Sequence, residues 1–277
     1  MLTPQQLKDI EHLQKECETH DHVQLKLNWD MLRDRESDQL DFFHYENGEL
    51  VAFLGLYTFG STVEVCGMVN PSERRKGHFH RLFRLGMEKV KQNGYKKILL
   101  NAPAGSNMAR AFLSKKGAEY AFSEHQMEWK EMPLEEDDGI LLRQAAWDDY
   151  EMRVRLSVAA FGVDEDDARV MESKALGDNT DMFMIVVNEG TVGKIRVSRE
   201  QGQAWIYGFA ILPEYQGKGI GRNVLRRVIK DQRSAGYSVH LEVETKNDHA
   251  LRLYESVGFK AVHAQDYYRY HQVNSGT

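Results

Sequence analysis

Apolar and polar positions divide the chain into two halves that carry the same predicted elements. In each half an apolar strand runs into a polar loop, at 62–69 (TVEVCGMV) and at 203–212 (QAWIYGFAIL). A helix follows each loop, at 80–94 and at 222–236, because apolar residues recur there at the three- and four-residue spacing of a helix with one buried side. The positions expected to be buried on these helices are Phe83, Met87, Val90, Val224, Leu225, Val228 and Ile229.

A second strand and a short helix follow in both halves, which align at an offset of about 141 residues. The strands are KKILLNAP at 96–103 and SVHLEVET at 238–245. The offset brings four pairs of residues together: Pro71 with Pro213, Gly77 with Gly219, Asn107 with Asn247, and Gly117 with Gly258. Matching residues in a matching element order indicate an internal duplication.

The boundary between the two copies is expected in the acidic segment 131–139 (EMPLEEDDG), which contains a proline and has no periodicity. We therefore predict a first domain of residues 1–133 and a second domain of residues 134–277. The first domain repeats the pattern of the second from residue 41 onward, although its opening helices are harder to place.

The second domain should open with a strand at 140–145, which has no clear equivalent in the first, and with helices at 147–161 and 164–176. Two strands then turn around Asn188-Glu189-Gly190. The full order is β-α-α-β-β-β-α-β-α-β. The predicted fold class is α/β in the α+β sense: two tandem domains, each a mixed, mostly antiparallel sheet flanked by helices.

Composition is that of a globular protein and excludes several other classes. The chain has 277 residues, 42% of them apolar and 28% charged, and no apolar run approaches the roughly 20 residues that cross a bilayer. The N-terminal segment is polar and helical in pattern, unlike a signal peptide. Cys17 and Cys66 are too few for a disulfide framework, so we expect a cytoplasmic protein.

Charge narrows the class of ligand. A net charge of −6 argues against nucleic-acid and membrane partners. Basic residues nevertheless gather at 74–84 and 217–227, beside the two glycine-containing loops. Local positive charge on an acidic protein fits a small polyanion.

The loop PEYQGKGIG, at 213–221, has the composition of a phosphate-binding loop. A strand, a glycine loop and a helix N-terminus together form an anion site, because backbone amides and the helix dipole both favour negative charge. The spacing GxxxxGK[ST] of a P-loop is absent, and Arg222 stands where the third glycine of a dinucleotide-binding fingerprint belongs.

The segment FAILPEYQGKGIGRNVL, at 209–225, resembles the acyl-CoA loop of the GCN5-related N-acetyltransferases, with their Q/R-x-x-G-x-G/A signature. The later segment NDHALRLYESVGF, at 247–259, resembles the family's asparagine, acid tyrosine and Gly-Phe segment. The resemblance covers residues 140 to about 270, with a weaker copy at about 40–130. The whole chain is similar to tandem acetyltransferases, of which mycothiol synthase is one branch.

The resemblance implies that acetyl-CoA is the cosubstrate and that no metal takes part. Backbone amides of residues 216–222 would bind its pyrophosphate, and residues 209–211 would pair main chain to main chain with its pantetheine arm. Asn247 would hold that arm, cap the helix that follows, or both. The implied cosubstrate-binding residues are Phe209, Ala210, Ile211, Gln216, Gly217, Lys218, Gly219, Ile220, Gly221, Arg222 and Asn247.

Acetyl transfer to an amine requires a base for the ammonium proton and an acid for the departing thiolate. Tyr254 matches the family's acid, and a phenol with a reference pKa near 10 is protonated at neutral pH. Strand alternation places Glu242 and Glu244 on one face, and Glu242 is the base that the resemblance favours, with Glu244 as the fallback. His240 and His249 are alternative bases or plain surface residues.

The first copy departs from the pattern at the positions that carry chemistry. Leu113 stands at the position of the tyrosine, Asn101 at that of the glutamate, and Phe79 at that of Gly221, although Arg74 to Gly77 are retained. We therefore expect no acetyl transfer in the first domain, while coenzyme A binding there stays open. The pairs of histidines at 20–22 and 78–80 come with no partner set, so no metal site is expected.

The function expected is an acetyl-CoA-dependent N-acetyltransferase that acts in the second domain by direct attack of a primary amine. The alternatives are a non-catalytic CoA-sensing or protein-binding tandem module and an enzyme similar to mycothiol synthase. The acceptor stays open among a protein N-terminus, a polyamine, an aminoglycoside and a small metabolite, as does the oligomeric state. The acidic residues 164–167 either attract a cationic acceptor or form an ordinary helix start.

Overall fold

The computed structural model describes residues 1–35, 38–134, 139–176 and 179–271. The chain forms two compact units: unit 1 contains Met1–Ser123 and His263–Thr277, and unit 2 contains Glu124–Val262. The predicted boundary segment at 131–139 lies partly outside the described residues.

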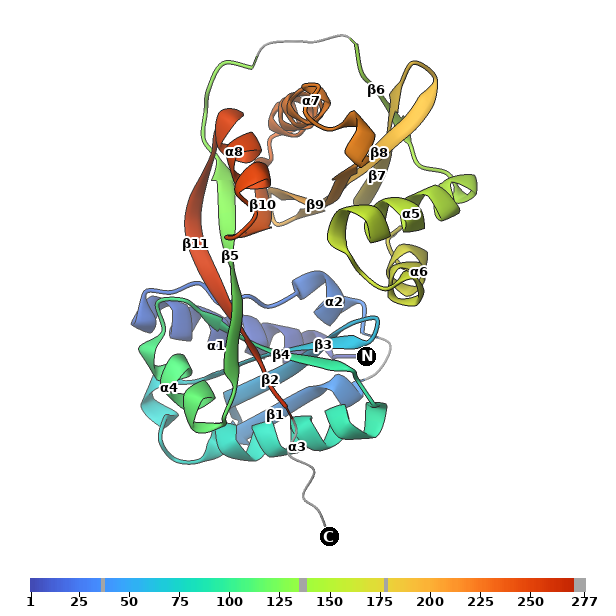
Figure 1. Ribbon diagram of the computed structural model, residues 1–277. Helices are drawn as coiled ribbons and strands as arrows, with labels where there is room; N and C mark the ends of the chain where they lie inside the picture. The colour runs from blue at the N-terminus through green and yellow to red at the C-terminus, as the bar shows by residue number, and fades with distance from the viewer. Residues whose placement is uncertain (36–37, 135–138, 177–178, 272–277) are drawn as a thin grey trace. The chain divides into compact units, whose positions relative to one another are not determined.

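Unit 1 is a sheet with helices on both faces (Figure 1). Its strands follow the order β1-β2-β3-β4-β11, in which β3 and β4 pair in parallel and the other pairs are antiparallel. Its helices and strands are α1 (Pro4–Asp21), α2 (Trp29–Arg33), β1 (Asp41–Glu46), β2 (Glu49–Phe59), β3 (Thr62–Val69), α3 (His78–Asn93), β4 (Lys97–Pro103), α4 (Asn107–Lys115) and the start of β5 (Glu119–Trp129), with the end of β11 (Phe259–Arg269).

Strand alternation divides the core of unit 1 between the two faces of its sheet. On β2, Leu54 and Leu56 pack with α3 and α4, whereas Phe53 and Tyr57 pack with α1 and α2. α1 begins at a capping box formed by Thr3 and Gln6, which satisfies two otherwise unpaired donors. As expected, no strand precedes α1 among residues 1–35.

Unit 2 has the predicted element order, completed by the start of β11 (Figure 1). Its sheet follows the order β5-β10-β9-β8-β7-β6, with β9 and β10 parallel and the other pairs antiparallel. Its remaining helices and strands are β6 (Leu141–Gln144), α5 (Tyr150–Phe161), α6 (Glu165–Ser173), β7 (Thr180–Val187), β8 (Gly190–Glu200), β9 (Gln203–Ile211), α7 (Ile220–Ser234), β10 (Ser238–Glu244) and α8 (Asp248–Ser256).

The apolar side of α7 confirms the periodicity seen in the sequence. Val224, Leu225, Val228 and Ile229 are all buried against the sheet of unit 2. Burial of each such side chain stabilises the fold by about 1.5–3 kcal/mol relative to exposure. The predicted turn between β7 and β8 is also present, with Asn188 and Glu189 at φ of 48° and 66°.

Each unit takes one strand from the other half of the sequence. The later part of β5 pairs with β10 in unit 2, from Glu124 with Glu244 to Glu128 with His240. The later part of β11 pairs with β4 in unit 1, where Tyr267 lies opposite Asn101. The boundary predicted at 133/134 from the duplication stays a prediction, and the compact units differ from it because they exchange their closing strands.

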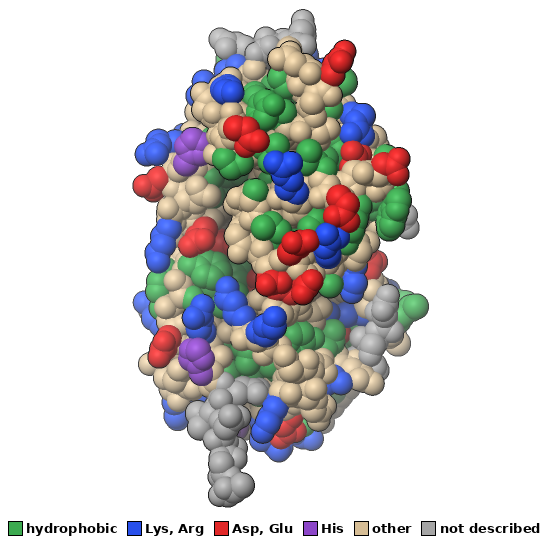
Figure 2. Space-filling model, turned by 45° about the vertical axis from the view of Figure 1, so that its right-hand side comes forward, with side chains coloured by type: hydrophobic (Ala, Val, Ile, Leu, Met, Phe, Trp, Pro, Cys, Tyr) green, Lys and Arg blue, Asp and Glu red, His purple; other side chains and the backbone are tan. Residues whose placement is uncertain are grey.

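Within the described part of the chain, every helix is too short or too polar to cross a membrane. On the face drawn in Figure 2, acidic and basic side chains are interspersed with apolar ones, so that face carries no continuous field of one sign.

Candidate active site

Strands β9 and β10 separate toward their carboxyl ends and leave a gap in the sheet of unit 2. They pair in parallel from Gln203 with Ser238 to Ile206 with Leu241. Beyond that point both strands continue without further pairing to each other among the described residues. After Ile206, the main-chain N–H and C=O groups of β9 that face the gap are therefore not paired with β10.

A β-bulge in β9 explains why the strands separate. The register of β8 against β9 shifts between Lys194 and Arg196, so that Gly208 and Phe209 together oppose one residue of β8. Gly208 has a φ of 55°, in the left-handed region that glycine enters without strain. A bulge bends its strand and increases its twist, which turns β9 away from β10.

The loop after β9 leads into a helix N-terminus with unengaged amides. Gly217 and Gly219 have φ of 72° and 83°, and α7 begins at Ile220 without a side-chain cap. The backbone amides of residues 217–221 donate to no acceptor within the described part of the chain. Such amides and the helix dipole together form a site for an anion such as a phosphate.

Two of the amides expected to bind pyrophosphate are already engaged. The amide of Gln216 donates to the carbonyl of Pro213 at 3.2 Å, and that of Arg222 donates to the carbonyl of Gly219 at 3.0 Å. The side-chain amide of Gln216 donates to the carbonyl of Ile211 at 2.8 Å, which fixes the loop to the end of β9. Gln216 therefore shapes the loop through its side chain, and the amides left available to an anion are those between it and Arg222.

Two cationic side chains border this loop. Lys218 and Arg222 are exposed, and neither forms an ion pair with another described residue. The Lys218 ammonium lies 5.2 Å from the ring centre of Tyr215. Both side chains are therefore free to meet a phosphate.

Tyr254 lies on α8, which the side chain of Asn247 caps by accepting a hydrogen bond from the amide of Ala250 at 3.1 Å. Its ring is half-buried and meets Phe259 edge-on, with 6.1 Å between the ring centres. Burial raises the pKa of Tyr254 to about 12, so the phenol stays protonated at neutral pH. Its hydroxyl has no hydrogen-bond partner within the described ranges, which leaves it available to a ligand.

Glu242 lies on the opposite face of β10 from the core. Leu241 and Val243 are buried with α7 and α8, so alternation turns Glu242 the other way, as the sequence indicated. The carboxylate of Glu242 is half-buried and accepts a hydrogen bond from Nε2 of Gln126 at 3.1 Å. Glu244, the fallback base, is exposed.

Gln126 contacts the predicted base, and the sequence did not indicate it. It is buried, lies on β5 directly opposite Glu242, and its side-chain Oε1 has no partner within the described residues. No local signal could have revealed it, because Gln126 belongs to the first half of the sequence and reaches unit 2 only through strand exchange.

The two histidines near the site have different surroundings. His240 is buried, stacks on Trp205 with 5.0 Å between ring centres, and hydrogen-bonds Ser238 Oγ at 2.8 Å. Burial lowers the pKa of His240, so its imidazole is neutral at pH 7. His249 is exposed on α8.

The acidic residues at 164–167 form a helix start. Asp164 caps α6, its carboxylate accepting a hydrogen bond from the amide of Asp166 at 3.0 Å. Glu165 pairs with Arg169 one turn later at 2.8 Å. These contacts fit the interpretation of an ordinary helix N-terminus.

A buried charged cluster joins α5 and α6 to β8. Lys194, 1% exposed, contacts the carboxylate of Glu172 and donates to Ser157 Oγ at 2.7 Å. Arg153, fully buried, lies 3.7 Å from the other carboxylate oxygen of Glu172. Because Lys194 lies opposite Ala210 in the register of β8 and β9, this cluster supports the strand that borders the gap.

The corresponding loop of unit 1 keeps the same backbone shape. Arg75 and Gly77 have φ of 69° and 93°, close to the values of Gly217 and Gly219. α3 also begins without a side-chain cap. A left-handed backbone conformation is strained for an arginine, so its presence at Arg75 indicates that the surrounding structure maintains this loop conformation.

Phe79 stands at the position of Gly221, and its ring fills the space between α3 and β3. Its ring lies against Gly67 of β3, where a Cβ would come within 2.5 Å of Phe79. In unit 2 the arrangement is reversed, since Phe209 of β9 approaches Gly221, whose Cβ would lie 3.6 Å from the Phe209 ring. The aromatic residue thus lies on the helix and the glycine on the strand in unit 1, whereas in unit 2 the aromatic residue lies on the strand and the glycine on the helix.

A cavity of about 490 Å³ lies in unit 1 between the ends of β3 and β4. Glu73, Arg74, Gly77 and His78 from the loop contribute to its wall. Leu113 and Asn101, which replace the acid and the base in the alignment, also line it. Unit 1 thus has space for a ligand beside its loop but neither of the predicted proton carriers.

Comparisons with known proteins agree with this geometry. The model of the acetyltransferase (GNAT) family matches residues 5–118 and, separately, residues 140–259. N-alpha-acetyltransferase RimI of Mycobacterium tuberculosis is 49% identical over 57 residues, which are 21% of this chain and 35% of RimI. The chain therefore spans only about a third of the length of that relative.

Two solved structures share the fold along nearly the whole chain. A GCN5-related N-acetyltransferase from Sphaerobacter thermophilus has a TM-score of 0.78 at 20% identity, covering 97% of this chain and 93% of that one. A tandem GNAT protein from the clavulanic acid biosynthesis pathway has a TM-score of 0.72 at 16% identity, covering 98% and 96%. The double family match and the tandem neighbour confirm the expected duplication and fold class.

Proposed function

The chain belongs to the GNAT acetyltransferase family, and from this premise we propose that unit 2 transfers an acetyl group from acetyl-CoA to a primary amine. The observation that carries the proposal is the gap between β9 and β10, which ends at the unengaged amides of residues 217–221. A diphosphate bound at those amides leaves the attached arm free to follow the unpaired edge of β9 into the gap. The residues present therefore fit the cosubstrate.

The cosubstrate would be held mainly by the backbone. The amides of residues 217–221 would bind its phosphates, with Lys218 and Arg222 adding charge. The main chain of Phe209 and Ala210 would pair with the pantetheine arm. The carbonyl of Ile211 already accepts a hydrogen bond from the side chain of Gln216, so it is less available to that arm. An amide at this edge would also polarise the thioester carbonyl as charge develops on its oxygen.

Glu242 would accept a proton from the amine, and Tyr254 would stabilise the departing sulfur. Glu242 accepts the proton that the ammonium must lose before its nitrogen attacks the carbonyl carbon, directly or through a water molecule. As the carbon–sulfur bond breaks, the Tyr254 hydroxyl donates a hydrogen bond to the sulfur, which departs as a thiolate, and the nitrogen loses its second proton to solvent. Glu242 projects from one face of β10, whereas Tyr254 packs with Leu241 and Val243 on the other, so the two groups approach the gap from opposite sides.

The acceptor proposed is a primary amine, and a peptide α-amine is the first class to test, because the RimI relative is named an N-alpha-acetyltransferase. An acceptor similar to that of mycothiol synthase is the small-molecule alternative.

A second candidate function, ligand binding without catalysis, is favoured for unit 1 by its cavity and its retained loop shape.

The test is release of free thiol from acetyl-CoA in the presence of a panel of amines: a peptide N-terminus, a polyamine, an aminoglycoside and an amino sugar. The matched variants are Glu242→Gln and Glu244→Gln, two neighbouring glutamates on one face of β10. We expect amine-dependent thiol release that falls by about 100-fold in Glu242→Gln and stays within about twofold in Glu244→Gln.

Equal activity of the two variants would remove Glu242 from the mechanism. A larger loss of activity in Glu244→Gln than in Glu242→Gln would assign the base to Glu244. No amine-dependent release with any member of the panel, in a protein shown to bind acetyl-CoA, would favour the alternative of a non-catalytic CoA-binding module.

A further inference from the structure

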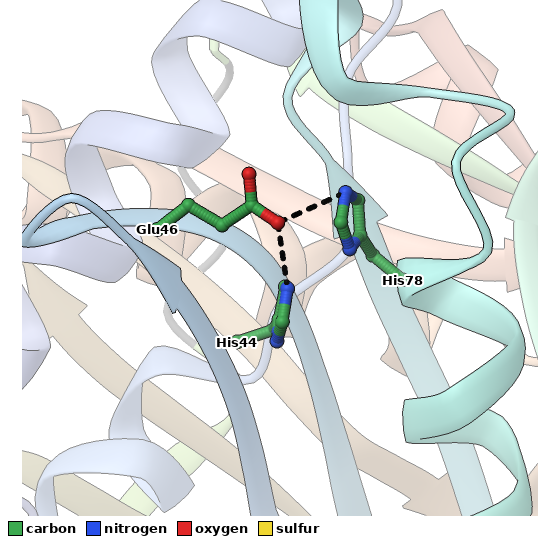
Figure 3. A group of neighbouring side chains, drawn as sticks. All are labelled: His44, Glu46 and His78. Atoms are coloured by element: carbon green, nitrogen blue, oxygen red, sulfur yellow. Dashed lines mark hydrogen bonds and ion pairs between the residues drawn. The ribbon is translucent and has the colours of Figure 1, made fainter.

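We propose that His44, Glu46 and His78 of unit 1 bind a divalent transition-metal ion such as Zn²⁺ (Figure 3). β1 contributes His44 and Glu46, and His78 is the first residue of α3. One ligand atom from each residue lies within 4.8 Å of the other two. The sequence offered no partner set for the histidines at 78–80, and the fold supplies one from a strand more than thirty residues earlier.

The separations fit a small metal ion. Nε2 of His44 lies 3.3 Å from Oε1 of Glu46, and Nε2 of His78 lies 3.6 Å from the same oxygen. A zinc ion bound tetrahedrally at about 2.0–2.1 Å keeps neighbouring ligand atoms about 3.4 Å apart. The two histidine nitrogens lie within 4.8 Å of each other, so rotation of the two imidazole rings toward a common point would complete the coordination geometry.

His78 has a buried nitrogen that makes no hydrogen bond within the described residues. Its side chain is 12% exposed, and its Nε2 is closed to solvent and forms no hydrogen bond within the described part of the chain. A buried polar atom without a hydrogen bond destabilises the fold, and a metal ion would satisfy it. Figure 3 shows this nitrogen directed at the carboxylate of Glu46, which His44 also faces.

The arrangement of the rings and charges also suits a cation. The rings of His44 and His78 stack with 4.4 Å between centres, which keeps both Nε2 atoms on the side of Glu46. The N-terminus of α3 repels a cation, and the carboxylates of Glu46 and Glu73 offset this. Oε2 of Glu73 lies 3.7 Å from Nε2 of His78, although it also pairs with Lys76 at 2.7 Å.

The ligand types select the class of metal. Two imidazoles and one carboxylate suit zinc, copper or nickel, whereas magnesium and calcium prefer oxygen ligands alone. A bound ion would fix β1 to the start of α3, next to the loop that lines the cavity of unit 1. This site is independent of the acetyl-transfer site proposed for unit 2.

The test is a calorimetric titration of the full chain, free of any affinity tag, with Zn²⁺ in a buffer that contains no chelator. The variants are His44→Ala and Glu46→Gln. His263→Ala is the matched control, because His263 is exposed on β11 and has no partner within the described ranges. Circular dichroism establishes that each variant is folded, and Glu46, 42% exposed, tolerates the change to glutamine sterically.

We expect saturable binding of one zinc ion whose affinity falls at least tenfold in His44→Ala and in Glu46→Gln and is unchanged in His263→Ala. No saturable binding up to about 1 mM zinc would overturn the proposal. Equal affinity of the wild type and the two ligand variants would also overturn it, since the zinc would then bind elsewhere. Neither result depends on acetyl transfer, so the proposal fails or stands separately from the function of unit 2.

Discussion

Replacement of Tyr254 by phenylalanine isolates the hydroxyl that the proposed mechanism uses. The ring keeps its edge-on contact with Phe259, and the hydroxyl has no hydrogen-bond partner among the described residues. The change should therefore leave the free energy of unfolding and the affinity for acetyl-CoA nearly unaltered. Only the rate of the chemical step should fall.

The size of the loss follows from the pKa of Tyr254, which burial raises to about 12. Transfer of its proton to a thiolate of pKa about 8.5 is unfavourable by roughly three to four orders of magnitude, so the hydroxyl acts mainly as a hydrogen-bond donor to the departing sulfur. A hydrogen bond to a charged group contributes about 1.5–3 kcal/mol. At 1.36 kcal/mol for each tenfold change, this predicts a fall in kcat of roughly 10- to 150-fold.

The assay is the rate of thiol release at saturating amine, with the dissociation constant for acetyl-CoA measured separately by calorimetry. Tyr237→Phe is the matched control, because Tyr237 also packs on the core of unit 2 but lies at the opposite end of β10 from the gap. We expect this variant to retain the wild-type kcat.

Two results would refute the reasoning. A change in kcat of less than threefold would show that Tyr254 does not assist the leaving group. A loss greater than about 10⁴-fold would indicate complete proton transfer and hence a much lower pKa in the complex.

Three further predictions concern stability. Glu172→Gln should lower the free energy of unfolding of unit 2 by about 3–5 kcal/mol, because it leaves two buried cations uncompensated; urea denaturation measures this, and an unchanged midpoint contradicts it. Gly67→Ala should destabilise unit 1 by about 1–3 kcal/mol, because a Cβ there would lie 2.5 Å from the Phe79 ring and 2.8 Å from the carbonyl oxygen of Phe53. Phe79→Gly should relieve the first of these clashes, so Gly67→Ala should lower the thermal midpoint less in a Phe79→Gly background; an equal loss in both backgrounds argues otherwise. The hydrogen bond from Arg74 lowers the pKa of Asp21, so this ion pair should add about 1 kcal/mol to the free energy of unfolding at neutral pH. That contribution should be lost as the pH falls through the lowered pKa of Asp21. A destabilisation by Asp21→Asn that does not change with pH would be inconsistent with this.

Local patterns were sufficient to predict the elements and the glycine loop. The buried side of α7 follows from helical periodicity, and the turn at Asn188-Glu189 follows from residues that adopt positive φ. The alternation that separates Glu242 from Val243 is equally local. These features depend on neighbours within a few residues, which the sequence displays directly.

Features made by distant residues could not be predicted in this way. Gln126 reaches Glu242 only because the units exchange strands, and His78 meets His44 only once β1 lies beside α3. The exchange of ring and glycine between Phe79 and Gly67 was hidden for the same reason, since each residue viewed alone looks like a departure from the pattern. Such contacts arise from tertiary packing and have no periodic signal.

The most direct test of the central claim is calorimetric titration of acetyl-CoA into the matched variants Gly219→Val and Gly77→Val. Both glycines have left-handed φ with open space around a Cβ, so valine strains the backbone of each loop while its Cβ meets no neighbour. We predict that one site per chain weakens at least tenfold in Gly219→Val and keeps its wild-type affinity in Gly77→Val. Wild-type binding in Gly219→Val, or no binding of acetyl-CoA by the unmodified protein, would contradict the assignment of the acetyl-transfer site to unit 2.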